Sequence, residues 1–216
     1  MQKINPHQER LDTLTDGYRG AQIVFEAVRV NLFEKLESPA QAEDVAAATG
    51  WTPRGARMLL DALVALDLIE KRNGTYRNLS AASDCLVPGS PHDQRHIILH
   101  RANCKLSWDL LGECLRTGGP ARPRQGARNP EELRAFILGM ADIAKTSAQT
   151  VIEAVDLTRF RNLLDVAGGP ATYTTTFLAA HPALRGTVFD LPEVIPIARE
   201  AVAQTPVADR VSFIAG

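Results

Sequence analysis

The chain has 216 residues and a formal net charge of −1, with 45% hydrophobic and 23% charged residues. This composition is ordinary for a globular protein of one or two domains. The near-neutral charge argues against a nucleic-acid partner or an anionic membrane surface, and no apolar run reaches the length of a membrane span.

Residues 1–100 predict a small domain of three helices and a hairpin. Apolar residues recur at helical spacing over Gly17–Leu36, and an alanine-rich helix over Ala42–Thr49 is closed by Gly50. A third helix begins with Thr52 as its N-cap and Pro53 as its first residue. The buried face expected for this helix consists of Met58, Leu59, Ala62, Leu63 and Leu66.

The Asn73-Gly74 pair between strand-like flanks predicts a β-hairpin, so this domain has the pattern of a winged helix. One hypothesis is therefore a DNA-binding regulator. Its recognition helix would offer only Arg54 and Arg57, and acidic residues outnumber basic ones over residues 1–90. We expect no nucleic-acid partner, and instead a homodimer formed through the apolar segment Tyr18–Leu36.

Residues 101–157 predict linking helices. Ser90-Pro91 is expected to open a helix that runs towards Leu115, and Gly118–Asn129 an exposed loop that carries Arg122, Arg124 and Arg128. Asn129 caps the next helix, which reaches about Val155. Its apolar stripe comprises Leu133, Phe136, Ile137, Met140, Ile143 and Ala144.

Residues 158–216 alternate between strand and helix. The expected strands are Asn162–Val166, Gly186–Phe189 and Val211–Ile214, and the expected helices are Pro170–Ala180 and Glu193–Gln204. Right-handed crossovers would make the sheet parallel. The fold class is thus mixed: a mainly helical winged-helix domain followed by a Rossmann-like α/β domain, which we expect to be incomplete because it has only three strands.

Two acids mark the ends of neighbouring strands. Asp165 precedes the small residues of a turn that includes Gly168 and Gly169, and Asp190 ends the next strand. Small residues let a nucleotide approach the backbone, and a carboxylate can accept hydrogen bonds from ribose hydroxyls. Two alternatives remain: a tight turn that binds nothing, and Asp190 as the N-cap of the following helix.

Four potential metal ligands recur every four residues: His92, His96, His100 and Cys104. Each step turns about 40° round a helix, so the four cannot converge on one ion, and we expect no metal site. His181 precedes a proline at a helix end and is interpreted as a capping residue.

Several motifs resemble those of the S-adenosylmethionine-dependent small-molecule O-methyltransferases that carry an N-terminal winged-helix dimerisation domain. This group includes acetylserotonin, caffeate and bacterial natural-product methyltransferases. The motifs that carry the resemblance are Thr52-Pro53-Arg54, Gly74-Thr75-Tyr76, Leu115-Arg116-Thr117-Gly118, Leu164-Asp165-Val166-Ala167-Gly168-Gly169, Phe189-Asp190-Leu191-Pro192 and Asp209-Arg210-Val211-Ser212-Phe213.

The resemblance implies roles for the cofactor residues. Asp165, Gly168 and Gly169 would form the turn beside the amino-acid end of S-adenosylmethionine. Asp190 would bind its ribose, and Leu191 would lie near its adenine.

For the methyl acceptor, the resemblance implies a pocket lined by Trp108, Phe136 and Met140. The resemblance implies methyl transfer to a hydroxyl of a small aromatic metabolite, so the protein would be a methyltransferase of class EC 2.1.1. The family's catalytic base would lie beyond Gly216, so no residue here receives that role, and a C-terminally truncated, inactive dimerisation scaffold is the remaining alternative.

The turn departs from the family pattern at Ala167 and Ala171, where glycine is usual. We expect Ala167 to require a negative φ, because alanine is strained at positive φ. Three cysteines without a CxxC pair, and a polar start at Met1–Asn5 where a signal peptide would be apolar, favour a cytoplasmic location.

Overall fold

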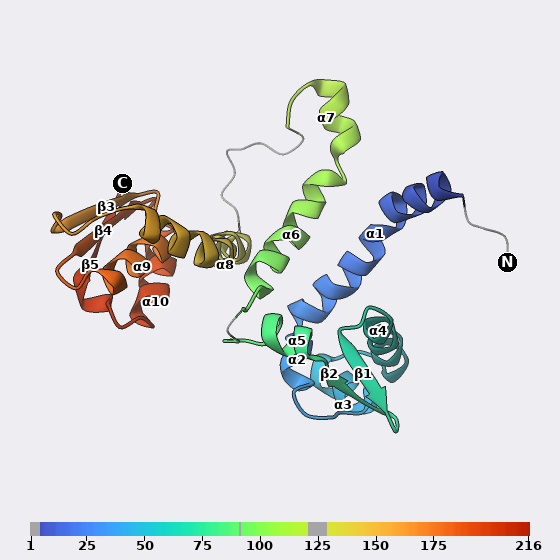
Figure 1. Ribbon diagram of the computed structural model, residues 1–216. Helices are drawn as coiled ribbons and strands as arrows, with labels where there is room; N and C mark the ends of the chain where they lie inside the picture. The colour runs from blue at the N-terminus through green and yellow to red at the C-terminus, as the bar shows by residue number, and fades with distance from the viewer. Residues whose placement is uncertain (1–4, 91, 121–128) are drawn as a thin grey trace. The chain divides into compact units, whose positions relative to one another are not determined.

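The computed structural model describes residues 5–90, 92–120 and 129–216. The chain divides into two compact units, Met1–Ala102 and Asn103–Gly216. Figure 1 labels the elements of both units. The three-part division at about residues 100 and 157 stays a prediction.

The first unit contains the hairpin and the second and third helices that the sequence predicts. The helix expected over Gly17–Leu36 differs, because α1 already begins at Pro6 and ends at Arg29, and Asn31 with a φ of 50° separates it from a short α2. Thr52 Oγ1 accepts a hydrogen bond from Gly55 N at 3.1 Å, which confirms the N-cap. Asn73 and Gly74 turn the hairpin with positive φ values of 51° and 83°. The elements are α1 (Pro6–Arg29), α2 (Leu32–Lys35), α3 (Ala42–Thr49), α4 (Pro53–Ala65), β1 (Ile69–Arg72), β2 (Thr75–Asn78) and α5 (Ser80–Cys85).

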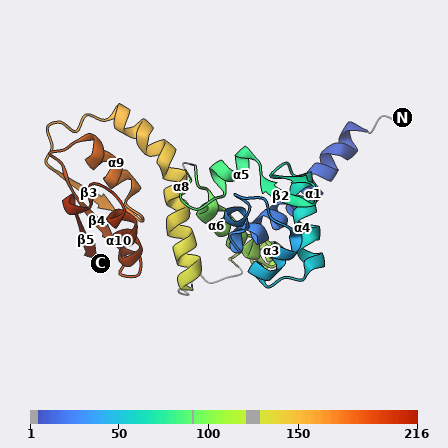
Figure 2. The ribbon, with the colours of Figure 1, turned by 90° about the horizontal axis from the view of Figure 1, so that it is seen from below.

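The core of the first unit lies among α1–α5 and the hairpin (Figure 2). Its large, fully buried side chains include Phe33, Leu60, Leu63 and Tyr76. The expected burial of Met58 and Leu66 is wrong, because these side chains are 63% and 39% exposed. Leu60 and Leu63 define the buried face of α4. Met58 precedes Leu60 by two positions, so its side chain points about 200° away from that of Leu60 round the helix.

The expected helix start at Ser90 is also wrong, since α6 (Arg95–Trp108) begins five residues later. Asp93, two residues before the first residue of α6, holds the start of the helix, because its Oδ1 accepts a hydrogen bond from Arg95 N at 3.0 Å. The next helix, α7 (Leu111–Thr117), is separate from α6. Pro91 and the three loop arginines, Arg122, Arg124 and Arg128, lie outside the described residues.

The second unit adds the long α8 (Pro130–Ala154), whose N-cap Asn129 accepts a hydrogen bond from Glu132 N as predicted. The predicted alternation of strand and helix follows it. Its elements are β3 (Asn162–Val166), α9 (Thr172–Ala180), β4 (Arg185–Asp190), α10 (Ile195–Ala203), a 3₁₀ turn η1 (Ala208–Arg210) and β5 (Val211–Ala215).

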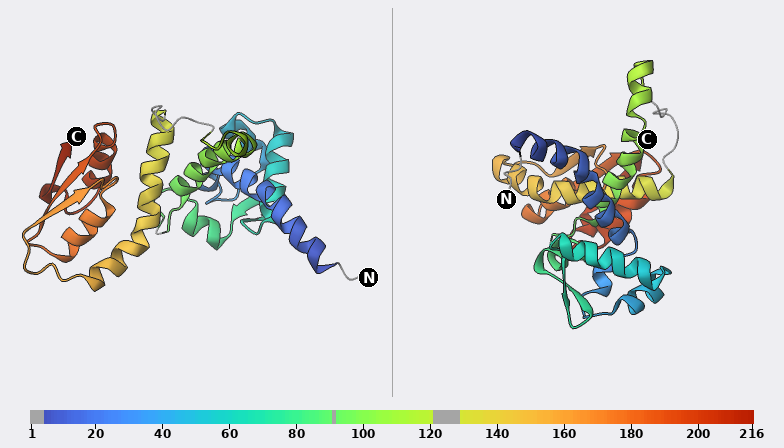
Figure 3. Two further views of the ribbon diagram at one scale, coloured as in Figure 1. Left: turned by 90° about the horizontal axis from the view of Figure 1, so that it is seen from above. Right: turned by 90° about the vertical axis from the view of Figure 1, so that its right-hand side faces the viewer.

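The three strands form one parallel sheet in the order β3-β4-β5. Figure 3 shows α9 and α10 together on one side of this sheet. On that side Gly186 and Val188 of β4 are buried. On the other side Leu164 and Val166 are 62% and 64% exposed. The mixed fold class is confirmed, and both carboxylates end strands at the same edge of the sheet.

Candidate functional site

A cavity of about 520 Å³ lies within the second unit, between α8 and the ends of β3 and β4. This volume falls in the range of small-molecule sites. The apolar stripe predicted on α8 forms one wall, and the turn after β3 and the segment after β4 form the opposite wall. The lining residues are Leu133, Phe136, Ile137, Met140, Ile143, Ala144, Ser147, Asp165, Ala167, Gly168, Gly169, Pro170, Thr172, Tyr173, Asp190, Leu191 and Val194.

Asp190 is held by backbone groups at the edge of this cavity and is only 9% exposed. Its Oδ2 accepts a hydrogen bond from Gly169 N at 2.8 Å, and its Oδ1 accepts one from Leu191 N at 2.7 Å. A carboxylate has about four acceptor positions, so about two remain for a ligand. The alternative of Asp190 as a helix N-cap is wrong, because Val194 holds that position before α10.

The two glycines of the turn are needed for different reasons. A Cβ at Gly168 would lie 2.8 Å from Asp165 Cγ and 3.0 Å from Val188 Cγ1. Gly169 instead has a positive φ of 54°, and its surroundings are open. The first glycine therefore gives the backbone room beside the acid, and the second allows the turn itself.

The expectation that Ala167 has a negative φ is wrong: its φ is 58°, and that of Ala171 is 63°. Both conformations are fixed by backbone hydrogen bonds. Ala167 N donates to Phe189 O at 2.8 Å, and Ala171 N donates to Gly168 O at 2.9 Å. Two alanines thus occupy left-handed conformations that cost roughly 1–2 kcal/mol each relative to glycine.

Asp165 lies partly buried at the end of β3 and lines the cavity. Its Oδ2 accepts a hydrogen bond from Thr174 Oγ1 at 2.7 Å. Thr174 is fully buried, with 0% exposure. Sequence reasoning missed this threonine, since its partner comes from a strand nine residues earlier and the contact depends on how α9 packs on the sheet.

A second pair missed from sequence is Ser147 on α8 and Tyr173 on α9. Their hydroxyl oxygens are 2.8 Å apart, and both residues line the cavity. Seven residues beyond Met140, Ser147 continues the apolar stripe, so the helical periodicity could have pointed to it. The pair brings hydroxyl groups to a wall that is otherwise largely apolar.

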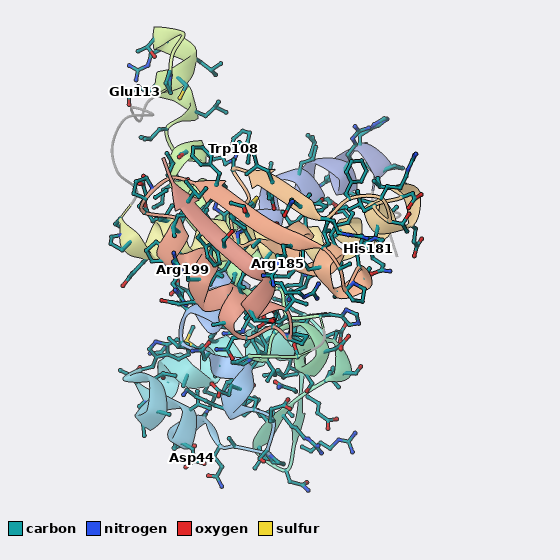
Figure 4. All side chains as sticks on the ribbon, turned by 90° about the vertical axis from the view of Figure 1, so that its left-hand side faces the viewer. Asp44, Trp108, Glu113, His181, Arg185 and Arg199 are labelled. Carbon is teal, nitrogen blue, oxygen red and sulfur yellow. The ribbon has the colours of Figure 1, made fainter. Side chains whose placement is uncertain are left out.

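The residues expected around the methyl acceptor are not all brought together. Phe136 and Met140 are half-buried and line the cavity. Trp108, labelled in Figure 4, ends α6 and is 71% exposed. It is not among the residues that line this cavity. Its place in an acceptor pocket stays a prediction.

The other candidate ligands show no site of their own. No group of three or more His, Cys, Asp or Glu side chains that could hold a metal ion occurs in the described part of the chain. His181 is the C-cap of α9, as predicted, and its backbone N donates to Phe177 O. Within the same described ranges, no helix is long and apolar enough to cross a membrane.

Arg57, one of the two arginines available to a DNA-binding helix, is engaged within its own domain. Its Nη2 lies 2.6 Å from Glu43 Oε1 on α3. A phosphate-contacting arginine would need this group to be available. The ion pair therefore disfavours the DNA-binding alternative.

Two family models match the chain and together cover most of it. An O-methyltransferase dimerisation domain matches residues 13–88, and an O-methyltransferase domain matches residues 116–216. The chain belongs to the family of O-methyltransferases that carry this dimerisation domain.

Individual relatives agree with the family. An acetylserotonin O-methyltransferase from Rattus norvegicus is 31% identical over 220 residues, which are 95% of this chain and 51% of the relative. The tetracenomycin polyketide synthesis 8-O-methyl transferase TcmO from Streptomyces glaucescens is 34% identical over 215 residues, or 94% of this chain and 62% of the relative. The chain thus spans about half to two thirds of these relatives.

A solved structure extends the likeness to the fold. The human N-acetylserotonin methyltransferase in complex with SAM superposes with a TM-score of 0.83 at 25% identity, covering 100% of this chain and 68% of that chain.

Proposed function

We propose that the cavity of the second unit binds S-adenosylmethionine, and that the protein transfers its methyl group to a hydroxyl of a small aromatic metabolite. The main support for this proposal is the position of the Asp190 carboxylate. Two backbone N–H groups fix it at the cavity edge, and its remaining acceptor positions match the two hydroxyls of a ribose.

The rest of the cavity fits the donor in size and chemistry. Its volume of about 520 Å³ accommodates an adenosyl group with an amino-acid side arm. Gly168 leaves backbone exposed beside Asp165, where a Cβ would collide with the carboxylate. Leu191, 53% exposed next to Asp190, offers an apolar surface for the adenine ring. When bound, the donor supplies an electrophilic methyl group on a sulfonium.

The apolar wall of α8 supports an aromatic acceptor. Phe136 and Met140 present a ring and a thioether to the cavity, and both groups pack well against aromatic rings. Their role for this chain is to hold the acceptor near the methyl group and to exclude water. Relatives named for acetylserotonin and for tetracenomycin support the class of acceptor.

The proposal assigns no general base, since no histidine is found among the described residues that line the cavity. The alternative without such a base is a scaffold that does not catalyse methyl transfer.

The proposal also includes a homodimer and a cytoplasmic location. The match to the dimerisation domain supports a homodimer formed through the N-terminal helices, and the three free thiols favour the cytoplasm.

Calorimetric titration with S-adenosylhomocysteine tests the donor site. In Asp190→Asn the charge is lost and an amide N–H₂ faces a backbone N–H, so we expect affinity to fall at least about tenfold. Asp209→Asn is the matched control, because Asp209 is exposed and lies outside the cavity. Unchanged affinity in Asp190→Asn, or an equal loss in both variants, would contradict the proposed site.

A further inference from the structure

A chain of four residues connects the middle strand to the turn that lines the cavity. A Cβ at Gly186 on β4 would lie 2.5 Å from Thr174 Cγ2. Thr174 Oγ1 donates a hydrogen bond to Asp165 Oδ2 at 2.7 Å. A Cβ at Gly168 would in turn lie 2.8 Å from Asp165 Cγ. Gly186 and Gly168 thus leave room for Thr174 and Asp165, and a Cβ at either glycine would displace its neighbour.

Both branches of the Thr174 side chain are in use. Its methyl group fills the space that Gly186 leaves, and its hydroxyl holds the carboxylate, while the residue is 0% exposed. A β-branched side chain has few χ1 rotamers, and tight packing on both branches selects one of them. Thr174 is thereby fixed, and it fixes the orientation of Asp165.

This orientation leaves one carboxylate oxygen for a ligand. Oδ2 is engaged by Thr174, and no hydrogen bond to Asp165 Oδ1 is found within the described residues. Asp165 lines the cavity opposite the apolar wall of α8. In surroundings of low polarity, an ionised oxygen favours a cationic N–H donor over a neutral one.

We propose that Thr174 is a positioning residue that holds Asp165 to receive the α-ammonium group of the donor's amino-acid arm. The inference rests on the proposed function. It divides recognition between two strand ends: Asp190 on β4 would take the ribose, and Asp165 on β3 would take the ammonium. Loss of the Thr174 hydroxyl should then weaken only ligands that carry the amino-acid arm.

Calorimetry with two probes separates these roles. S-adenosylhomocysteine carries the amino-acid arm, and 5′-methylthioadenosine lacks it. Thr174→Val keeps the shape of the side chain but removes the hydroxyl, whereas Thr174→Ser keeps the hydroxyl. Thr176→Val is the control, because among the described residues Thr176 Oγ1 donates a hydrogen bond to Thr172 O of the same helix alone, at 2.6 Å.

We expect Thr174→Val to weaken S-adenosylhomocysteine about tenfold and to leave 5′-methylthioadenosine within about twofold. Thr176→Val should stay close to the wild type for both probes. Thr174→Ser keeps the hydroxyl but loses the methyl group beside Gly186, so it should lose less affinity for S-adenosylhomocysteine than Thr174→Val does. If Thr174→Val is poorly folded, Asp165→Asn provides the same readout, a loss confined to the probe with the arm.

Other results overturn the inference. An equal loss for both probes in Thr174→Val would show a purely structural role, and no loss would show that the hydroxyl is dispensable. If the wild-type chain binds 5′-methylthioadenosine as tightly as S-adenosylhomocysteine, the amino-acid arm adds no affinity. The inference then fails, while the proposed nucleoside site stands. If the wild type binds neither probe, both proposals fail.

Discussion

Ala167 shows how a single residue can be strained at a ligand site. It has a φ of 58°, is exposed, and donates its N–H to Phe189 O. Glycine adopts this conformation without the steric penalty that a Cβ causes, roughly 1–2 kcal/mol. Its greater backbone freedom in the unfolded chain offsets about 0.4–1 kcal/mol of that gain. We expect Ala167→Gly to raise the free energy of unfolding by about 0.5 kcal/mol, as measured by urea denaturation.

The control for this substitution is Ala179→Gly, at an exposed position inside α9 of the same unit. Glycine in a helix should lower stability there by about 0.5–1 kcal/mol. A loss of stability in Ala167→Gly as large as in Ala179→Gly would contradict the strained conformation at position 167.

Asp93 in the first unit ties stability to pH. Burial by itself raises the pKa of Asp93, but the hydrogen bonds and charge of Arg95, together with Gly89 N, outweigh it and lower the pKa below the usual value. The carboxylate is buried, and its Oδ2 lies 2.9 Å from Arg95 Nη2. Its stabilising effect is therefore complete above about pH 4 and is lost as the pH falls through the lowered pKa.

We expect Asp93→Asn to lower the free energy of unfolding by about 1–3 kcal/mol at pH 7. The difference from the wild type should shrink in urea titrations below pH 4, because protonation removes the same charge. Asp16→Asn, which breaks an exposed ion pair with Arg19, should leave the free energy of unfolding close to the wild-type value at both pH values. A difference that is independent of pH would argue against the Asp93 ion pair as its cause.

Arg210 links three elements of the second unit. From η1, its guanidinium donates to Leu178 O at 2.7 Å, Leu184 O at 3.0 Å, and both His181 O and Pro182 O at 3.1 Å. Leu178 O lies in the last turn of α9, where carbonyl groups have no N–H partner within the helix. The other three carbonyls lie in the connection between α9 and β4. The arginine thus closes the connection that places β4 and, at its far end, Asp190.

A lysine cannot reproduce the planar fork of donors, so we expect Arg210→Lys to lower the free energy of unfolding by about 2 kcal/mol. The control is Arg185→Lys, since Arg185 is exposed at the start of β4 (Figure 4). Denaturant unfolding of both variants provides the comparison, and equal stabilities would contradict the role given to Arg210.

The elements that the sequence predicts well are those with local signals. Thr52-Pro53 and Asn129-Pro130 mark helix starts through cap chemistry, and Asn73-Gly74 marks a turn through positive φ. The start of α6 differs from the expected Ser90, because Asp93 pairs with Arg95 and the guanidinium of Arg95 also donates to Asn31 Oδ1, 64 residues earlier, a contact that local spacing does not reveal.

The site divides in the same way. Asp165 and Asp190 could be placed at neighbouring strand ends, since parallel strands connected by helices bring their ends to one edge. Thr174 and Tyr173 could not be placed, because their partners are set by the packing of α9 against β3 and α8. The positive φ of Ala167 likewise follows from tertiary hydrogen bonds that override residue preference.

On the scale of the whole molecule, α1 carries an apolar stripe that its own unit leaves uncovered. Leu11, Leu14 and Tyr18 are 61%, 71% and 59% exposed, and their spacing places them on one face of the helix. The match to a dimerisation domain over residues 13–88 supports a second copy of the chain as the partner of this face. Exposed apolar faces of this kind mark interaction sites.

We expect Leu14→Glu to shift the proposed dimer to monomer, because a charge would be buried in the interface. Thr13→Glu adds the same charge at an exposed position that is about 100° or more round the helix from each of Leu11, Leu14 and Tyr18, and should leave the dimer intact. Light scattering coupled to size-exclusion chromatography measures both variants. A dimer that survives Leu14→Glu at micromolar concentration would exclude the N-terminal part of α1 from the interface.

The most direct test of the donor site is a crystal structure of the chain with S-adenosylhomocysteine. We predict that the ribose hydroxyls lie at about 3 Å from the Asp190 carboxylate, the separation of a hydrogen bond. The amino-acid arm should extend past Gly168 towards Asp165. A ligand bound elsewhere, or with its ribose away from Asp190, would contradict the proposed methyl-donor site.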